Sequence, residues 1–266
     1  MNYTFLREHA LHALLLCDPI EKASYIKQLI QEGPYPVGAT LTLHEPAQIP
    51  GRPQKPVIVP PQQVKQRSLQ SIEGRATLLH ALAHIEFNAI NLALDIIWRY
   101  PHMPDMFYGE WLCVAYEEVL HFELLNRHLQ SIGYTYGDFP AHDGLWDMAE
   151  RTKDDLIARL ALVPRTLEAR GLDACPVVRG KLAQAGDEAG AAILDIILRD
   201  EVGHVALGNK WYRWVCEQKQ VDAISIYPDL ATHYRAPRLK GPFNFPARQA
   251  AGFFPEELDY LQQQAQ

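Results

Sequence analysis

The sequence predicts an all-α protein whose core is a four-helix bundle, with proline-rich extensions before and after it. Apolar residues recur at helical spacing in several long stretches, and no stretch alternates apolar and polar residues long enough to form a convincing strand. The chain has 266 residues, 48% of them hydrophobic, which suffices for one sizeable core with attached segments. We therefore expect N-terminal helices and a proline-rich arm over 1–67, the bundle over 68–220, and a wrapping tail over 221–266.

The N-terminal part is expected to contain two short helices, over 3–16 and 19–32, because a helix-start signal and a Gly-Pro stop frame the second one. Residues 34–62 contain eight prolines and little helical pattern. This composition predicts an extended arm on the surface, anchored by burial of the apolar residues 57–59. A disordered linker is the alternative.

The bundle is expected to begin near Ser68, and prolines and glycines mark where its helices end. The predicted helical regions run from about 68 to 99, from 104 to 132, from 144 past Pro164 to 170 with an interruption from Gly171 to Pro176, and from 187 to 218.

The tail contains the segment GPFNFPARQAAGFF, with four phenylalanines and one arginine, Arg248. Exposing so many rings to water is unfavourable. We expect the tail to bury these rings against the bundle and Arg248 to pair with a carboxylate.

Two long helices contain the pattern Glu-x-x-His, as Glu118 with His121 and as Glu201 with His204. Residues three apart project from one helix face, so each pair can bind one metal ion. Both pairs lie within apolar stripes, which face a core. A buried carboxylate is costly unless something compensates its charge, and a divalent metal does so directly.

Glu86 also lies in an apolar stripe, on the first long helix, and is expected to point inward. His80 and His84 fall on a different stripe, which we expect to face solvent, and for these two histidines we predict a polar or partly buried position. A role around the metal or at a substrate gate is the alternative for these two histidines. The residues of the polar stripe are Glu73, Thr77, His80, His84, Asn88, Asn91 and Asp95.

Spacing suggests the remaining ligand. Glu86 precedes Glu118 by 32 positions, a span that fits a return to the same height of a helical hairpin. Glu168 precedes Glu201 by 33 positions, so two pseudo-symmetric hairpins would bring all these groups to one level. The competing acids Glu150, Asp154 and Asp155 lie too far from Glu201 in sequence for such a hairpin.

This set matches the ligands of di-iron and di-manganese carboxylate bundles, in which two helices each supply one Glu and two supply Glu-x-x-His. Carboxylate and imidazole ligands suit iron or manganese better than a metal that prefers thiolates. We expect iron, with manganese or a mixed Fe/Mn pair as the alternatives. A metal-free bundle with buried acid–histidine pairs is the alternative, but four converging glutamates would repel one another without a cation. The predicted ligands of two metal ions are Glu86, Glu118, His121, Glu168, Glu201 and His204.

Five segments carry a resemblance to a known family: LLHALAHIEFNAINLALDII, EEVLHFELLNRHLQSIGY, VPRTLEARGLDACP, RDEVGHVALGNKWYRWVCE and GPFNFPARQAAGF. Together they resemble the ferritin-like family known as domain of unknown function 455, over nearly the whole chain. The resemblance implies a ferritin-like four-helix bundle, the same six ligands, and oxygen or peroxide chemistry at two irons. Two departures from ferritin itself, the proline-rich arms and the lack of a rubredoxin-like cysteine module, make an enzyme a better expectation than iron storage.

We therefore expect a di-iron oxidoreductase or monooxygenase that activates O2 on an unidentified substrate, either a small molecule or a tRNA-linked group. Its electrons must come from an external donor, because the sequence lacks a nucleotide-binding motif such as G-x-G-x-x-G. Two other functions stay open: a ferroxidase or peroxide-detoxifying protein, and a non-enzymatic helical interaction module with a structural metal.

The net charge of −7 gives no general attraction for nucleic acid or an anionic membrane. We therefore expect neither as a partner, with tRNA as the one exception, since the substrate can be a tRNA-linked group. The N-terminus does not read as a signal peptide, and no apolar run reaches the roughly 18 residues of a membrane span. We expect a cytoplasmic protein, and a homodimer is compatible with the sequence. The four cysteines are widely spaced, which argues against a zinc-ribbon or thioredoxin-type site.

Overall fold

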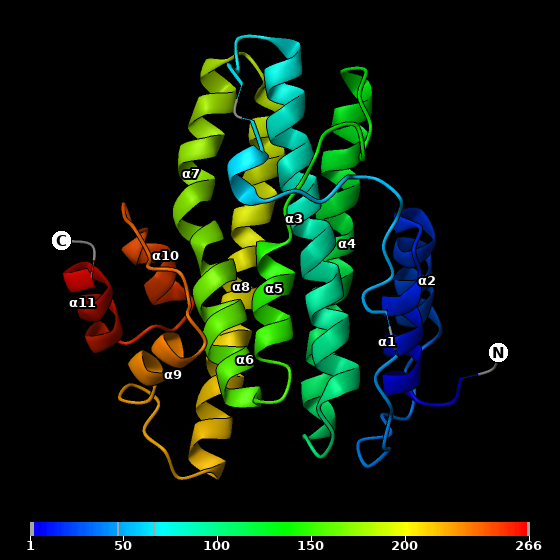
Figure 1. The fold of residues 1–266 in the computed structure, drawn as a ribbon, viewed down its shortest axis with the longest axis vertical. Coiled ribbons are helices and arrows are strands. Elements are labelled where there is room, and N and C mark those ends of the chain that lie inside the picture. The colour runs from blue at the N-terminus through cyan, green and yellow to red at the C-terminus, as the bar shows by residue number, and fades with distance from the viewer. Residues whose placement is uncertain (1–2, 47, 66, 265–266) are drawn as a thin grey trace. The chain divides into compact units, whose positions relative to one another are not determined.

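The computed structural model describes residues 3–46, 48–65 and 67–264, and these form helices joined by irregular segments (Figure 1). Within the described ranges the sole β-type pairing is an isolated bridge between Ile58 and Ala141. The all-α prediction is therefore confirmed. No helix in these ranges combines the length and the apolar character needed to cross a membrane.

The chain forms two compact units, Met1–Gly144 and Leu145–Gln266. Each unit contains one pair of long helices with shorter elements packed around it. The three-part division expected from the sequence stays a prediction.

Unit 1 is built around two long helices, α3 and α4, which lie side by side (Figure 1). A short link joins them, so they run antiparallel. The side chain of Ser71 begins α3 by accepting a hydrogen bond from the Gly74 backbone, 3.0 Å away. The elements of unit 1 are α1 (Leu6–Leu15), α2 (Pro19–Glu32), η1 (Pro61–Gln63), α3 (Ile72–Arg99) and α4 (Asp105–Ser131).

The polar stripe of α3 is buried, so the expectation of a solvent-like stripe containing His80 and His84 is wrong. The backbone N–H of Gly137 donates to His80 Nε2 over 2.9 Å, and the Tyr136 hydroxyl lies 2.8 Å from His84 Nδ1. Partners from a distant loop thus contact one ring nitrogen of each histidine, on a helix face that periodicity alone would leave to solvent. The buried members of this stripe are Thr77, His80, His84, Asn88, Asn91 and Asp95.

The proline-rich arm is extended, as predicted, but its apolar residues do not anchor it. Val57 and Ile58 are 61% and 40% exposed. The arm is held by its backbone: the Val59 N–H donates to the Ala141 carbonyl over 2.8 Å, and the Ala141 N–H donates to the Val57 carbonyl over 3.0 Å. The expectation that residues 57–59 bury their side chains is therefore wrong for the first two.

Unit 2 is built around α7 and α8. The interruption predicted between Gly171 and Pro176 is absent, because α7 continues through both residues. Leu172 and Leu182 are fully buried, and this packing offsets the roughly 3 kcal/mol that an internal proline costs a helix. The elements of unit 2 are α5 (Gly144–Arg151), α6 (Leu156–Leu162), the π-helix η2 (Val163–Glu168), α7 (Ala169–Gln184), α8 (Glu188–Gln218), α9 (Tyr227–His233), α10 (Phe245–Ala250) and α11 (Pro255–Gln264).

The tail packs into unit 2. Arg248 is completely buried and forms the predicted ion pair, with its Nη2 lying 2.6 Å from Asp173 Oδ2. Phe253 is buried in a cluster that includes Leu172, whereas Phe254 is 46% exposed. The expectation of buried phenylalanines therefore holds for one of the last two rings and not for the other.

Gly208 of α8 allows a close approach to η2. A β-carbon at this position would lie 2.7 Å from Cβ of Pro164, a distance that real β-carbons essentially never adopt. We expect Gly208→Ala to lower the free energy of unfolding by about 1–3 kcal/mol, because the helix and η2 must move apart. Urea unfolding monitored by tryptophan fluorescence measures the change.

Gly203→Ala is the matched control in the same helix, because a β-carbon there would meet no atom within 4 Å. Its effect should be neutral, or stabilising by up to about 1 kcal/mol through helix propensity. Equal destabilisation by both substitutions would contradict the close packing assigned to Gly208.

A candidate metal centre

Three predicted ligands meet between α3 and α4 in unit 1. His121 Nδ1 lies 3.3 Å from Glu86 Oε2 and 3.4 Å from Glu118 Oε2. One ligand atom from each residue lies within 4.8 Å of the other two. All three side chains are buried, with exposed fractions of 4% for Glu86, 2% for Glu118 and 1% for His121.

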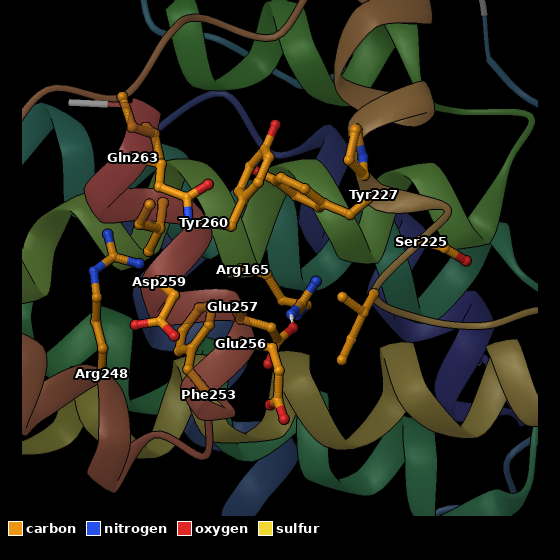
Figure 2. A pocket seen from close by; sticks show the side chains of 14 residues that line it. Arg165, Ser225, Tyr227, Arg248, Phe253, Glu256, Glu257, Asp259, Tyr260 and Gln263 are labelled. Carbon is orange, nitrogen blue, oxygen red and sulfur yellow. Dashed lines mark hydrogen bonds and ion pairs between the residues drawn. The ribbon is translucent and has the colours of Figure 1, made fainter. Parts of the chain in front are cut away.

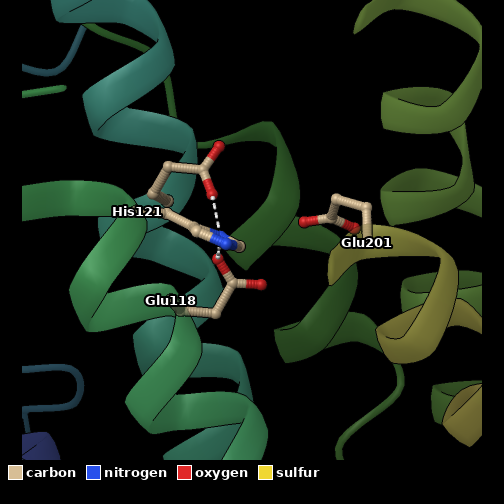
Figure 3. Close-up of side chains that lie close together, drawn as sticks. Glu118, His121 and Glu201 are labelled. Atoms are coloured by element: carbon tan, nitrogen blue, oxygen red, sulfur yellow. Dashed lines mark hydrogen bonds and ion pairs between the residues drawn. The ribbon is translucent and has the colours of Figure 1, made fainter. Parts of the chain in front are cut away.

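The local sequence explains this arrangement. Glu118 and His121 are three positions apart on α4, so their side chains share one face, as Figure 3 shows. Phe87 and Phe122 directly follow Glu86 and His121, and their ring centroids are 5.6 Å apart. This aromatic contact fixes the register of the two helices beside the polar groups.

Two buried carboxylates next to one imidazole require positive charge. Burial alone lowers the pKa of His121, but hydrogen bonds to Glu118 and Glu86 and the charges of both carboxylates outweigh it, so the net shift is upward. A proton on His121 therefore balances part of the negative charge when no cation is bound. A divalent metal would replace this proton and use the same three ligands.

The second Glu-x-x-His pair lies on α8 in unit 2. Glu201 and His204 are both buried, and His204 Nδ1 lies 3.6 Å from Glu201 Oε1. This separation is too long for a hydrogen bond and is suited to two groups that share a common ion. Figure 3 shows Glu201 with its carboxylate projecting from α8.

Glu168 is half-buried and is the last residue of the π-helix η2. A π-helical turn widens the backbone locally, and such turns occur frequently at functional sites. The structure therefore places this predicted ligand at an irregular position of the helical backbone.

The competing acids are engaged elsewhere or exposed. Asp155 caps α6 by accepting hydrogen bonds from the backbone of Ile157 and Ala158 over 3.0 and 3.2 Å. Glu150 forms an ion pair of 2.6 Å with Lys153, and Asp154 is exposed. These three acids therefore lack the burial that the two Glu-x-x-His pairs share.

The structure thus groups Glu86, Glu118 and His121 in unit 1, and brings Glu201 close to His204 in unit 2. The assignment of these residues and Glu168 as metal ligands stays a prediction. The burial of His80 and His84 close to Glu86 in sequence was missed, because their partners come from a loop some fifty residues away.

Sequence comparisons agree with the resemblance drawn from the motifs. The model of the family described as "Protein of unknown function (DUF455)" matches residues 15–259. A protein of Haemophilus influenzae, described as "Uncharacterized protein", is 51% identical over 216 residues, which cover 79% of this chain and 75% of the relative. No solved structure matches the chain. With its family model spanning nearly every helix of both units, the chain belongs to the DUF455 family.

Proposed function

We propose that this protein is a ferritin-like di-metal carboxylate protein, in which Glu86, Glu118, His121, Glu168, Glu201 and His204 together hold two metal ions, with iron favoured. We further propose that it is an oxidoreductase that uses O2 on a small or tRNA-linked organic substrate. The buried Glu86–His121–Glu118 group carries the proposal, because such a concentration of carboxylate charge in a core needs a cation.

The residues present fit such a centre. Carboxylate oxygens with imidazole nitrogen are ligands that iron and manganese accept readily. The unit 1 group offers two carboxylates and one imidazole, and the second Glu-x-x-His pair repeats the pattern in unit 2. Both histidines are at most 2% exposed, so a bound ion would be shielded from bulk water.

The chain's own residues bind, orient and exclude water. Glu86 and Glu118 each supply a carboxylate oxygen within 3.4 Å of His121 Nδ1 and fix the orientation of its ring. Phe87 and Phe122, which follow Glu86 and His121 in the sequence, are buried and add apolar surface to this part of unit 1. Bound iron would supply the redox chemistry needed to activate O2, and an external donor would supply the electrons.

Anaerobic loading with Fe(II) followed by exposure to O2 tests the proposal. We expect about two iron ions per chain by elemental analysis, and a change in the absorption spectrum with O2 consumption. A chain that binds no iron would refute the metal centre. A chain that binds iron but leaves O2 unconsumed would refute the oxidoreductase and favour the structural-metal alternative.

Glu168→Gln tests the least constrained ligand. We expect the substitution to weaken one metal position at least about tenfold while the other stays occupied, because each ion retains its own histidine. Metal titration followed by elemental analysis measures the two affinities. Glu150→Gln is the control and should leave both unchanged, because Glu150 pairs with Lys153. Equal binding by Glu168→Gln and the unmodified protein would remove Glu168 from the ligand set.

A further inference from the structure

Unit 2 contains a cavity of about 450 Å³ that shares none of the six proposed metal ligands (Figure 2). Its lining comes from η2, from the start of α9 and from the tail up to Gln263. Cavities of this size accommodate small organic molecules. The cavity is therefore large enough to bind a small organic ligand.

Two buried arginines line the cavity, and both contact the same aromatic ring. The guanidinium carbons of Arg165 and Arg248 each lie 5.3 Å from the centroid of Phe253. The exposed fractions are 3% for Arg165 and 0% for Arg248. Each arginine already has a carboxylate partner, so a ligand can add only a hydrogen bond to a guanidinium N–H that this partner leaves unsatisfied.

The hydrogen bonds of the two arginines differ. Two nitrogens of Arg165 have partners, because its Nε donates to Asn209 Oδ1 over 2.5 Å and its Nη2 pairs with Glu257. Arg248 pairs with Asp173 through Nε and Nη2, but within the described part of the chain its buried Nη1 has no hydrogen-bond partner. A buried donor left in this state costs about 1–3 kcal/mol, which a ligand acceptor would recover.

The remaining walls are largely aromatic and apolar. The rings of Tyr227 and Tyr260 are nearly perpendicular, at 86°, with centroids 6.1 Å apart, and Figure 2 shows them next to each other. Leu261 adds apolar surface from α11. Such walls favour a planar ring, which can stack on one tyrosine and meet the edge of the other.

Acidic residues limit the charge of the ligand. Glu256 and Asp259 also line the cavity, and both are exposed. Their carboxylates would repel a dianion such as a phosphate monoester more strongly than a single carboxylate.

We propose that this cavity is a binding site for a small aromatic monocarboxylate, whose ring lies against Tyr227 and Tyr260 and whose carboxylate accepts a hydrogen bond from Arg248. The site is separate from the proposed metal centre, and its occupation does not depend on metal.

Isothermal titration calorimetry of the full chain with naphthoate tests the proposal. We expect saturable one-to-one binding. Naphthamide, the neutral analogue, should bind at least about tenfold more weakly, because it loses the charge-assisted hydrogen bond. Naphthyl phosphate, the dianionic analogue, should also bind at least about tenfold more weakly, because the carboxylates of the cavity repel it. Equal binding of naphthoate and naphthamide would overturn recognition of the carboxylate.

Tyr260→Ala should weaken naphthoate binding at least about tenfold, because a stacking wall is removed. Gln262→Ala is the matched control, since Gln262 is exposed on the same helix and does not line the cavity. Leu261→Trp should also weaken binding, by filling the cavity. Unchanged binding in Tyr260→Ala and Leu261→Trp, or no binding to the unmodified chain at millimolar naphthoate, would overturn the site.

Discussion

His121→Ala is expected to cut the amount of bound metal sharply while leaving the helix content nearly unchanged. His121 is the one nitrogen ligand of the unit 1 group, and it lies within 3.4 Å of both carboxylates. Removing it deprives an ion of a direct ligand. Metal affinity should therefore fall at least about tenfold, which is the smallest loss typical of substitutions at residues that only support a ligand. His204→Ala should act in the same way on the second pair. Elemental analysis and circular dichroism measure the two quantities.

His128→Ala is the matched control, because His128 lies near the end of the same helix, where its Nδ1 lies 3.3 Å from the Ser131 hydroxyl, and it is not among the proposed ligands. It should bind metal like the unmodified protein. Near-normal metal content in both His121→Ala and His204→Ala would refute the ligand assignment.

Arg7→Met is expected to destabilise unit 1 by about 3 kcal/mol or more, because several buried carbonyl acceptors lose their donor. Arg7 is 1% exposed and donates to the carbonyls of Trp98 over 2.6 Å and Leu41 over 2.7 Å. It also donates to Ile97 and Gly38 over 3.3 and 3.1 Å. One guanidinium thus joins α1, the last turn of α3 and the proline-rich arm. Its positive charge also interacts favourably with the C-terminal end of α3. Urea unfolding measures the loss.

Arg75→Met is the control for this substitution. Arg75 is half-buried and donates to the single carbonyl of Leu69 over 3.0 Å. Its loss should cost less than about 1 kcal/mol, as is usual for such positions. If Arg7→Met and Arg75→Met were equally stable, Arg7 would not be the connection that these hydrogen bonds indicate.

The burial of Glu86, Glu118 and His121 could be predicted from the sequence, because the pattern that indicates it lies within single helices. Glu118 and His121 are one helical turn apart, and Glu86 interrupts an apolar stripe of α3. In each case a carboxylate lies where periodicity demands burial, which indicates a compensating charge.

Features that depend on distant partners could not be predicted in this way. Asn91 looks solvent-exposed from helical spacing, yet it is buried because the ammonium of Lys22 donates to it. Likewise Pro176 predicts a helix break, yet α7 continues because Leu172 and Leu182 pack in the core of unit 2. Periodicity describes one helix at a time and contains no information about which remote residue covers a given face.

A crystal structure of the Fe(II)-loaded protein, with anomalous scattering measured at the iron edge, tests the central claim most directly. The account predicts two iron peaks, with carboxylate oxygens and imidazole nitrogens of Glu86, Glu118, His121, Glu168, Glu201 and His204 at roughly 2.0–2.5 Å from them. The absence of any peak beside His121, or a single ion held by the unit 1 group with Glu201 and His204 unbound, would contradict it.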